Sequence, residues 1–409
     1  MANLLVQALR ANSKEGEFDA NASIISYKTG FPVLDYYLGY KVYVYDNDNN
    51  IVDQYNCIGI AAGSFNTFIG KPSTSKTTTA VQVAANIVRP FENGTVIHYD
   101  LEQAQNYTRI QALAKFTIRE MEEGKYILRQ EQNGIDDIYK AIMKVYFEKM
   151  NNPDKYQYDT GKLNEFGEKI ILFEPTVIII DSIAAMSESI NENDSKDVKK
   201  ISELEGQTYA NRVARELSQF MTKLMPRLRA ANIIIIAINQ IKQKIDIGLS
   251  KSAAQIFYLD QDETLPGGQA PQFYAHNLIK FIAVGSEKYT VEKDGFDGFG
   301  VRAKVIKSRT NQAGQEFISI FDKQRGIDSE RTSVRYAKDN GLLGGARRDN
   351  MYFVDDKDTK LSIIDIHKSF NENPELYKIM YKHIIPSLEE RLSALLPEEL
   401  NENPYLLDY

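Results

Sequence analysis

The sequence predicts a three-layer α/β fold in which a mostly parallel, doubly wound sheet is covered by helices on both faces. The first observation is a set of short apolar, β-branched runs, which are typical of strands buried on both faces. They lie within 64–69, 94–103, 176–182 and 232–238. The second is a helical pattern at 77–88, which follows the first run after a short loop. The third is that acidic residues end two of the runs, at the edge where open α/β sheets bind ligands.

The first run leads into a candidate phosphate-binding loop at 70–77, which matches G-x-x-x-x-G-K-T except that Ser75 replaces the second glycine. Backbone N–H groups of such a loop and the N-terminus of the next helix converge on phosphate oxygens. Lys76 would reach the terminal phosphates of ATP, and Thr77 would hold Mg²⁺. The expected nucleotide-binding residues of this loop are Gly70, Ser73, Thr74, Ser75, Lys76, Thr77 and Thr78. A Ser/Thr-rich turn before an ordinary helix is the alternative, and Ser75 favours it.

Carboxylates follow the next two apolar runs. Asp181 ends the run at 176–181 and is the candidate second Mg²⁺ ligand, beside Thr77. Glu102 follows the strand-like run that begins at Gly94, and it is the candidate base that activates water. Asp100 competes for that role. A carboxylate in such a position can also simply cap a helix.

Several motifs before, within and after the fourth run resemble one known family. They are Thr29–Asp35, Ala214–Gln219, Ile238–Lys242, Gly267–Ala275 and Lys304–Thr310. In order and spacing this set resembles the RecA-like recombinase family, over about residues 25–335. The wording K-S-R-T at 307–310 is closer to phage recombinases of the UvsX type. The resemblance implies a RecA-like ATPase core.

The resemblance assigns further roles by position. Gln240 is implied to sense the γ-phosphate and to pass its state to the adjoining DNA-binding loop. Lys307 and Arg309 are implied to reach the ATP of a neighbouring subunit, as arginine fingers do. Tyr107 is the candidate residue for stacking on adenine. Judged by residue type alone, Gln240 could merely close a strand and a K-x-R pair is often a solvated face.

Two long segments are implied to contact DNA, and loops this long are usually functional or disordered. The second segment, 241–269, contributes lysines for phosphates and Ile245 as an apolar wedge between bases. The first segment, about 186–209, carries lysines that nearby acids offset, so a solvated charge run explains it almost as well. The implied DNA-binding residues are Lys199, Lys200, Gln207, Arg215, Lys242, Lys244, Ile245, Gly267 and Gly268.

Composition is compatible with this interpretation and decides little. The net charge of −7 and the pI near 5.4 are unusual for a nucleic-acid binder. DNA contact can nevertheless be confined to a few lysines in a groove. The single cysteine, Cys57, rules out an intramolecular disulfide and suggests a reducing compartment. No apolar run is long enough for a membrane span and the N-terminus lacks a secretory pattern, so we expect a cytoplasmic protein. The resemblance to phage recombinases implies a phage protein within a bacterial host.

The resemblance divides the chain into an N-terminal oligomerisation element at 1–28, the ATPase core with its DNA-binding loops at 29–335, and a helical C-terminal region with an acidic tail at 336–409. Relative to bacterial RecA, insertions are expected at 40–56 and 149–170. The implied function is ATP-dependent DNA strand exchange by a helical filament on single-stranded DNA, with double-stranded DNA as second substrate. Mediator and single-strand-binding proteins are possible partners. A hexameric DNA helicase with the same core, or a nucleotide-binding filament protein without strand exchange, are the alternatives.

Overall fold

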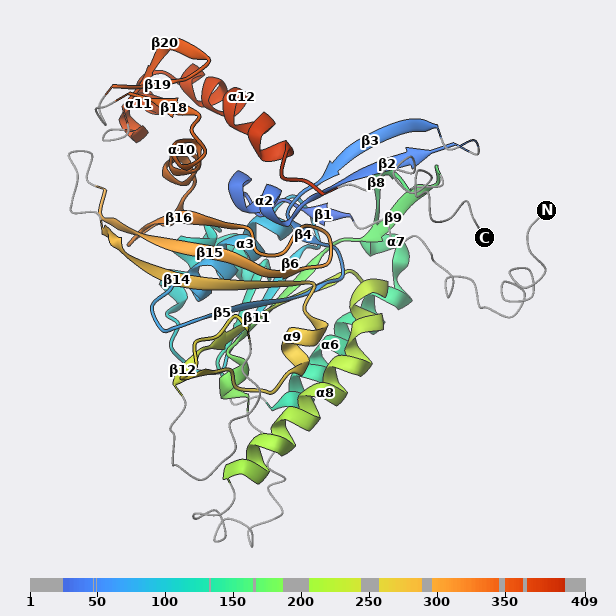
Figure 1. Ribbon diagram of the computed structural model, residues 1–409. Helices are drawn as coiled ribbons and strands as arrows, with labels where there is room; N and C mark the ends of the chain where they lie inside the picture. Colours follow the sequence, from blue (N-terminus) through green and yellow to red (C-terminus); the bar gives the residue numbers. More distant parts are fainter. Residues whose placement is uncertain are drawn as a thin grey trace, which may run out of the picture.

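A nine-stranded sheet forms the centre of the computed structural model (Figure 1). The structure describes residues 25–46, 48, 50–131, 134–164, 167–186, 206–243, 257–288, 296–345, 350–362 and 366–393, without side chains at 206–213 and 286–288. The strand order is β17-β16-β15-β14-β5-β11-β10-β6-β7. These strands are β5 (Phe65–Gly70), β6 (Thr95–Asp100), β7 (Tyr126–Arg129), β10 (Thr176–Asp181), β11 (Ile233–Gln240), β14 (Asn277–Lys288), β15 (Gly298–Ser308), β16 (Glu316–Asp322) and β17 (Gly326–Asp328).

The strands from β14 through β5, β11, β10 and β6 to β7 are parallel, and β15, β16 and β17 extend the sheet in antiparallel fashion. Register aligns the carboxyl ends of the central strands, so that Asp181 pairs with Asp100 and Gln240 pairs with Gly70. The polar residues that end these strands therefore meet at one edge. This confirms the predicted mostly parallel sheet.

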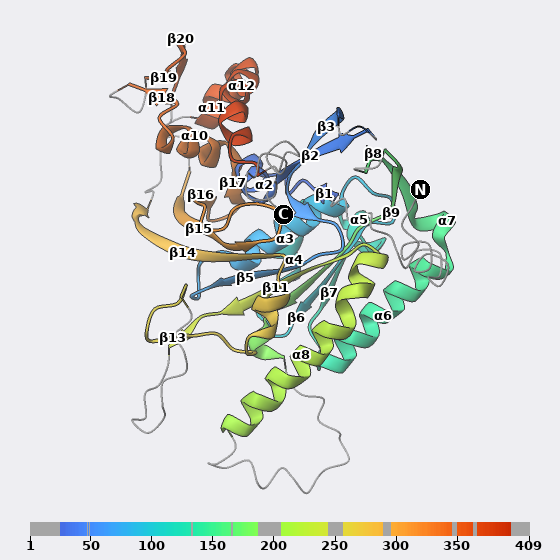
Figure 2. The same ribbon diagram turned by 45° about the vertical axis from the view of Figure 1, so that its right-hand side comes forward.

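Helices cover both faces of the sheet. On one face lie α2 (Pro32–Leu38), α3 (Lys76–Val88), α4 (Tyr107–Ala114), α5 (Ile118–Glu122) and α10 (Ser329–Asp339). On the other lie α6 (Ile135–Asn151), α8 (Gly206–Ala230) and α9 (Ala270–Tyr274), with α6 and α8 side by side (Figure 2). Short helical turns α7 (Pro153–Tyr156) and η1 (Ile183–Ala185) complete this part.

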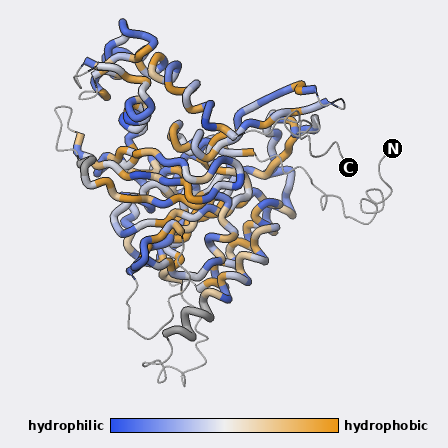
Figure 3. The backbone as a smooth tube through the Cα atoms, in the orientation of Figure 1, coloured by the Kyte–Doolittle hydropathy of each residue, from blue (hydrophilic) through white to orange (hydrophobic). Residues whose placement is uncertain are grey.

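The β-branched runs explain the two cores. In β10, Val177 and Ile179 pack into the core under α3, whereas Ile178 and Ile180 pack into the core under α6 and α8. Successive side chains of a strand point to opposite faces, so a run without polar residues requires apolar layers on both. Hydropathy along the backbone follows this arrangement, with apolar residues gathered in the central sheet (Figure 3).

The two expected insertions form antiparallel hairpins that lie side by side (Figure 1). The first pairs β2 (Tyr40–Tyr45) with β3 (Ile51–Cys57), and the second pairs β8 (Gln157–Leu163) with β9 (Lys169–Phe173). The hydroxyl of Tyr55 donates to the carbonyl of Leu163 at 3.0 Å, and Lys162 Nζ lies 4.8 Å from the centre of the Tyr55 ring. Below them, β1 (Ser26–Tyr27) pairs with β4 (Ile60–Ala61).

The C-terminal region combines helices with a small sheet. Helices α11 (Ile366–Glu372) and α12 (Glu375–Glu389) agree with the expected helical character. A three-stranded antiparallel sheet, β18 (Leu343–Gly344), β19 (Met351–Phe353) and β20 (Asp356–Leu361), was not predicted. Its strands are short, and β20 is mostly polar, so they lack the apolar alternation that indicates a strand. Residues 1–24 of the oligomerisation element expected at 1–28 lie outside the described residues, as does the whole acidic tail expected at 397–409.

Candidate nucleotide site

The phosphate loop joins the end of β5 to the start of α3. Gly70 leaves no space for a side chain, because an added Cβ would lie 2.5 Å from the carbonyl oxygen of Phe281. Ser75 has φ 61° and ψ 21°, the left-handed conformation that glycine adopts most easily. The loop therefore keeps the backbone of a phosphate cradle although a serine replaces its second glycine. The strain of such a residue costs about 1 kcal/mol or more.

Lys76 is the buried cation of the site. Its Nζ donates to the carbonyl oxygen of Lys71 at 2.7 Å. Burial lowers the pKa of Lys76 to about 8, against the opposing attraction of Asp181 and Glu102. A phosphate oxygen would compete with the Lys71 carbonyl for this ammonium group. The phosphate would have the advantage, because it carries a negative charge and the carbonyl does not. The geometry thus suits an anionic ligand.

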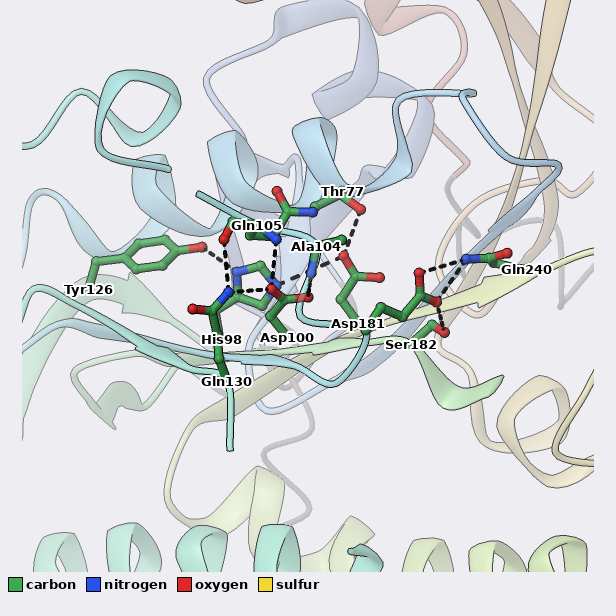
Figure 4. Close-up of polar contacts among 11 residues, drawn as sticks. Thr77, His98, Asp100, Ala104, Gln105, Tyr126, Gln130, Asp181, Ser182 and Gln240 are labelled. Carbon is green, nitrogen blue, oxygen red and sulfur yellow. Dashed lines mark hydrogen bonds and ion pairs between the residues drawn. The ribbon is translucent and has the colours of Figure 1, made fainter. Parts of the chain in front are cut away.

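Thr77 and Asp181 form the candidate metal pair, and the Thr77 hydroxyl donates to Asp181 Oδ2 at 2.7 Å (Figure 4). Burial raises the pKa of Asp181 to about 6, despite that hydrogen bond. A hydroxyl and a carboxylate are hard oxygen ligands of the kind that Mg²⁺ prefers, and the ion usually keeps several waters and phosphate oxygens as its other ligands. These two residues fit that ion, and its positive charge would favour the ionised form of Asp181.

His98 and Tyr126 lie behind Asp181, and no sequence pattern had pointed to either residue. His98 Nδ1 and the Tyr126 hydroxyl are 2.9 Å apart, and His98 Nε2 lies 4.0 Å from Asp181 Oδ2. Burial lowers the pKa of His98 to about 4, so the ring is neutral at pH 7. A neutral ring leaves the negative charge of Asp181 available to a metal ion.

Asp100 and Glu102, the two candidate bases, have different surroundings. The buried carboxylate of Asp100 accepts hydrogen bonds from the backbone N–H groups of Ala104 and Gln105 and from the side-chain amide of Gln130. It therefore holds the turn that carries Glu102. Glu102 lines the cavity beside the phosphate loop. The geometry favours Glu102 as the group that faces a water molecule.

Glu102 is held by two donors, Gln240 and Ser182. Gln240 Nε2 donates to Glu102 Oε1 at 2.8 Å and to Oε2 at 3.0 Å, and the Ser182 hydroxyl donates to Oε1 (Figure 4). Ser182 was missed by the sequence analysis, although it directly follows Asp181. Gln240 is the last residue of β11, and the connector 241–269 begins directly after it. The contact therefore links the candidate base to the start of the connector.

A cavity of about 560 Å³ contains these groups, a size suited to a nucleotide. Beyond the phosphate loop its wall is formed by Gln105, Arg109, Phe299, Phe321, Asp322 and Lys323. Arg109 donates to the carbonyl oxygens of Lys323 and Gln324, both at 3.2 Å. Tyr107 is 49% exposed and is not among the described lining residues. Its assignment to adenine stays a prediction, and Arg109 is the better placed side chain of α4.

Lys307 and Arg309 lie at the other end of the sheet from the phosphate loop. Lys307 and Thr67 both pair with Leu278, whereas Gly70 pairs with Phe281 further along β14. Lys307 Nζ donates to the carbonyls of Gln272 and Phe273, and Arg309 donates to Phe273. Neither cation is among the described residues that line the cavity.

The connector begins and returns through a two-stranded ladder of β12 (Lys242–Gln243) and β13 (Glu263–Thr264). Lys242 is exposed there, and Arg215 is exposed on α8. Gly267 and Gly268 have positive φ and pack closely against Ile183 and Ala214, which gives both glycines a structural role as well. Gln207 lies on α8 without a described side chain. The candidates Lys199, Lys200, Lys244 and Ile245 lie outside the described residues.

No helix among the described residues has both the length and the apolar character that a membrane span requires.

Comparison with known proteins gives matches to two family models. The AAA domain model matches residues 54–204, and the RecA N-terminal domain model matches residues 135–321. Together they include β10 and the residues around Asp181. They indicate a nucleotide-hydrolysing ATPase, in agreement with the phosphate loop.

Three relatives illustrate the likeness. Protein RecA of Ureaplasma parvum serovar 3 is 23% identical over 361 residues, which are 86% of this chain and 88% of that protein. Protein RecA of Aquifex aeolicus is 26% identical over 322 residues, 78% of this chain and 76% of that one. The mitochondrial DNA repair protein recA homolog of Dictyostelium discoideum is 28% identical over 171 residues, 41% of this chain and 32% of that protein. Together with the sheet and its phosphate loop, these matches support a RecA-like family for the chain.

Proposed function

We propose that this protein is an ATP-dependent DNA strand-exchange recombinase of the UvsX type, which forms helical filaments on single-stranded DNA. ATP and Mg²⁺ are the proposed cofactors, single- and double-stranded DNA the substrates, and DNA stimulates hydrolysis. The observation that carries the proposal is the pair of hydrogen bonds from Gln240 to Glu102, at 2.8 and 3.0 Å. The cytoplasm of a bacterial host of a phage is the proposed setting, with mediator and single-strand-binding proteins as partners.

The contact between Gln240 and Glu102 joins hydrolysis to the connector. Glu102 accepts a proton from the attacking water, while Lys76 and the loop amides bind the phosphates. A γ-phosphate offers Gln240 a second acceptor, and a side-chain amide can exchange one partner for another. Because the connector begins one residue later, such an exchange changes how its outgoing strand is held. DNA on the connector and nucleotide in the cavity then affect each other's affinity reciprocally.

The placement of Lys307 and Arg309 supports assembly as a condition for turnover. Both cations lie remote from their own chain's phosphate loop, and Arg309 is exposed. Phe273, 67% exposed beside them, gives the same surface an apolar side chain. Positive charge supplied by a neighbour stabilises phosphoryl transfer, so an isolated subunit would be nearly inactive.

The test measures ATP turnover with and without single-stranded DNA and images the complex by negative-stain electron microscopy. The proposal expects DNA-stimulated turnover and open helical filaments. Closed rings would favour a hexameric helicase, and filaments without stimulation would favour a nucleotide-binding filament protein. A Gln240→Ala variant should retain nucleotide affinity and lose its coupling to DNA affinity. Unchanged coupling would remove Gln240 from its role.

A further inference from the structure

A buried glutamate, Glu263, holds the returning strand of the connector against the phosphate loop. Its side chain is 1% exposed, and its Oε1 lies 3.0 Å from Lys71 Nζ. Oε2 lies 3.3 Å from Lys280 Nζ and also accepts the backbone N–H of Asp260 at 3.0 Å. Lys280 lies in β14, opposite Ile69 of β5. The carboxylate is thus fixed by one cation from the sheet and one from the loop.

The two cations differ in a way that matters for the function of the contact. Lys280 has a 13% exposed side chain and also donates to the carbonyl of Tyr258, so it anchors the strand to the sheet. Lys71 is 58% exposed and is not among the described residues that line the nucleotide cavity. The ion pair with Glu263 raises the pKa of Lys71. Its side chain is therefore directed to the connector rather than to the nucleotide.

Lys71 also touches the phosphate-binding lysine through its backbone. Its carbonyl oxygen accepts from Lys76 Nζ at 2.7 Å and from the Thr74 hydroxyl at 2.8 Å. When Lys76 turns to a phosphate, that carbonyl loses a charged donor. The peptide at residue 71 is thus the point where phosphate binding and the returning strand of the connector meet.

We propose that the Lys71–Glu263 ion pair is a second link between the nucleotide and the connector, acting on its returning strand as Gln240 acts on its outgoing strand. The outgoing strand already touches the loop, because Ile241 N–H donates to the Gly70 carbonyl at 3.1 Å. Neighbouring loop residues, 70 and 71, thus hold both strands of the ladder. Glu263 and Lys71 are positioning residues, since neither touches the reacting atoms.

The inference rests on the proposed function, and its test separates the two. Affinity for a labelled single-stranded oligothymidylate is measured with and without a thiophosphate analogue of ATP. The ratio of the two affinities is the coupling, typically about 5- to 150-fold where such coupling exists. Glu263→Gln should reduce this ratio by roughly three- to tenfold and leave analogue affinity unchanged. The matched control is Glu123→Gln, which breaks an exposed ion pair of 2.7 Å with Arg119, remote from the connector.

Lys71 provides the second variant, because its exposed side chain can be changed with little risk to folding. Lys71→Met should lower the coupling ratio as Glu263→Gln does, and Lys71→Arg should restore most of it. Hydrogen exchange at residues 257–264 gives a readout without DNA: the analogue should protect this strand in the wild-type protein and protect it less in Lys71→Met. Wild-type coupling in both charge-removing variants, or no nucleotide-dependent protection in the wild type, overturns the inference. No coupling in the wild-type protein counts against the proposed function instead.

Discussion

Two buried lysines at opposite ends of the sheet have opposite tasks. Burial lowers the pKa of Lys76 to about 8 and that of Lys149 to about 7. Lys149 donates to the carbonyl oxygens of Glu174 and Ala231, at 2.7 and 3.0 Å. It thereby links the two segments that lead into β10 and β11. Lys76 has one short bond to a carbonyl and borders a cavity. Lys149 therefore stabilises the fold, because two carbonyl oxygens accept its hydrogen bonds. Lys76 remains available to a ligand, because it borders the cavity.

The sharpest test of this contrast is the loss of Lys76. Lys76→Ala should lower kcat for ATP by about a thousandfold, because the developing phosphate charge loses its cation. Steady-state turnover measures it, and thermal unfolding should show a folded protein. Turnover within tenfold of the wild type would place the phosphate contact elsewhere.

The two carboxylates beside Lys76 extend the contrast to acids. Glu102→Gln should lower kcat by about 10² to 10⁴-fold while analogue affinity changes little. Asp100→Asn is the matched variant: it retains one of the two side-chain oxygens that accept hydrogen bonds from the turn and should lower kcat far less. Single-turnover kinetics distinguish the two. A larger loss for Asp100→Asn would exchange their roles.

Lys149 tests the structural half of the comparison. Lys149→Met removes both hydrogen bonds from buried carbonyls and should lower the free energy of unfolding by about 1–3 kcal/mol. Urea unfolding measures it at pH 8. Burial lowers the pKa of Lys149 from 10.5 in the unfolded chain to about 7 in the folded state, so the stability that Lys149 contributes falls as the pH falls from about 10.5 to 7. The difference from the Met variant should therefore shrink over that range and stay constant at lower pH. An unchanged kcat per folded molecule is the control.

At acidic pH, the affinity for Mg²⁺–nucleotide should depend on the protonation of Asp181. Its pKa of about 6 means that protons compete with Mg²⁺ below that pH, so affinity for Mg²⁺–nucleotide should fall by up to about tenfold per unit. Above pH 8, Lys76 loses its charge and affinity falls again. Calorimetric titrations from pH 5 to 9 measure the fall in affinity at both ends of the range. The Asp181→Asn variant is the control, because any pH dependence that it retains comes from protonation of the nucleotide itself. A wild-type fall in affinity at acidic pH that matches that of the Asn variant would contradict the assignment.

The smallest expected effect concerns Ser75. Ser75→Gly removes the strain of the left-handed conformation and should raise the free energy of unfolding by about 1 kcal/mol, less the added freedom of glycine in the unfolded chain. Ser75→Ala is the control, since alanine suffers the same strain. Equal stability of the glycine and alanine variants would show that the loop relaxes around serine.

The sequence was most informative where one residue type dominates. The runs at 176–181 and 232–238 predicted central strands because only burial on both faces tolerates such continuous β-branched sequence. Chain order then predicted the meeting of Lys76, Thr77, Asp181 and Glu102 at one edge. Contacts between distant residues escaped it: His98 and Tyr126 bear no local signature of their position behind Asp181. The pairing of Lys71 with Glu263 likewise depends on folding, not on spacing.

The contact between the β2–β3 and β8–β9 hairpins makes them a single structural unit. Tyr55 of one hairpin bonds to Leu163 of the other, and Tyr158 at the base of the second hydrogen-bonds to Tyr27 at 2.8 Å. Deleting either hairpin would therefore remove a contact that supports the other hairpin. A chimaera that transfers this corner to a related protein must therefore include both hairpins, together with Tyr27, which hydrogen-bonds to the second one.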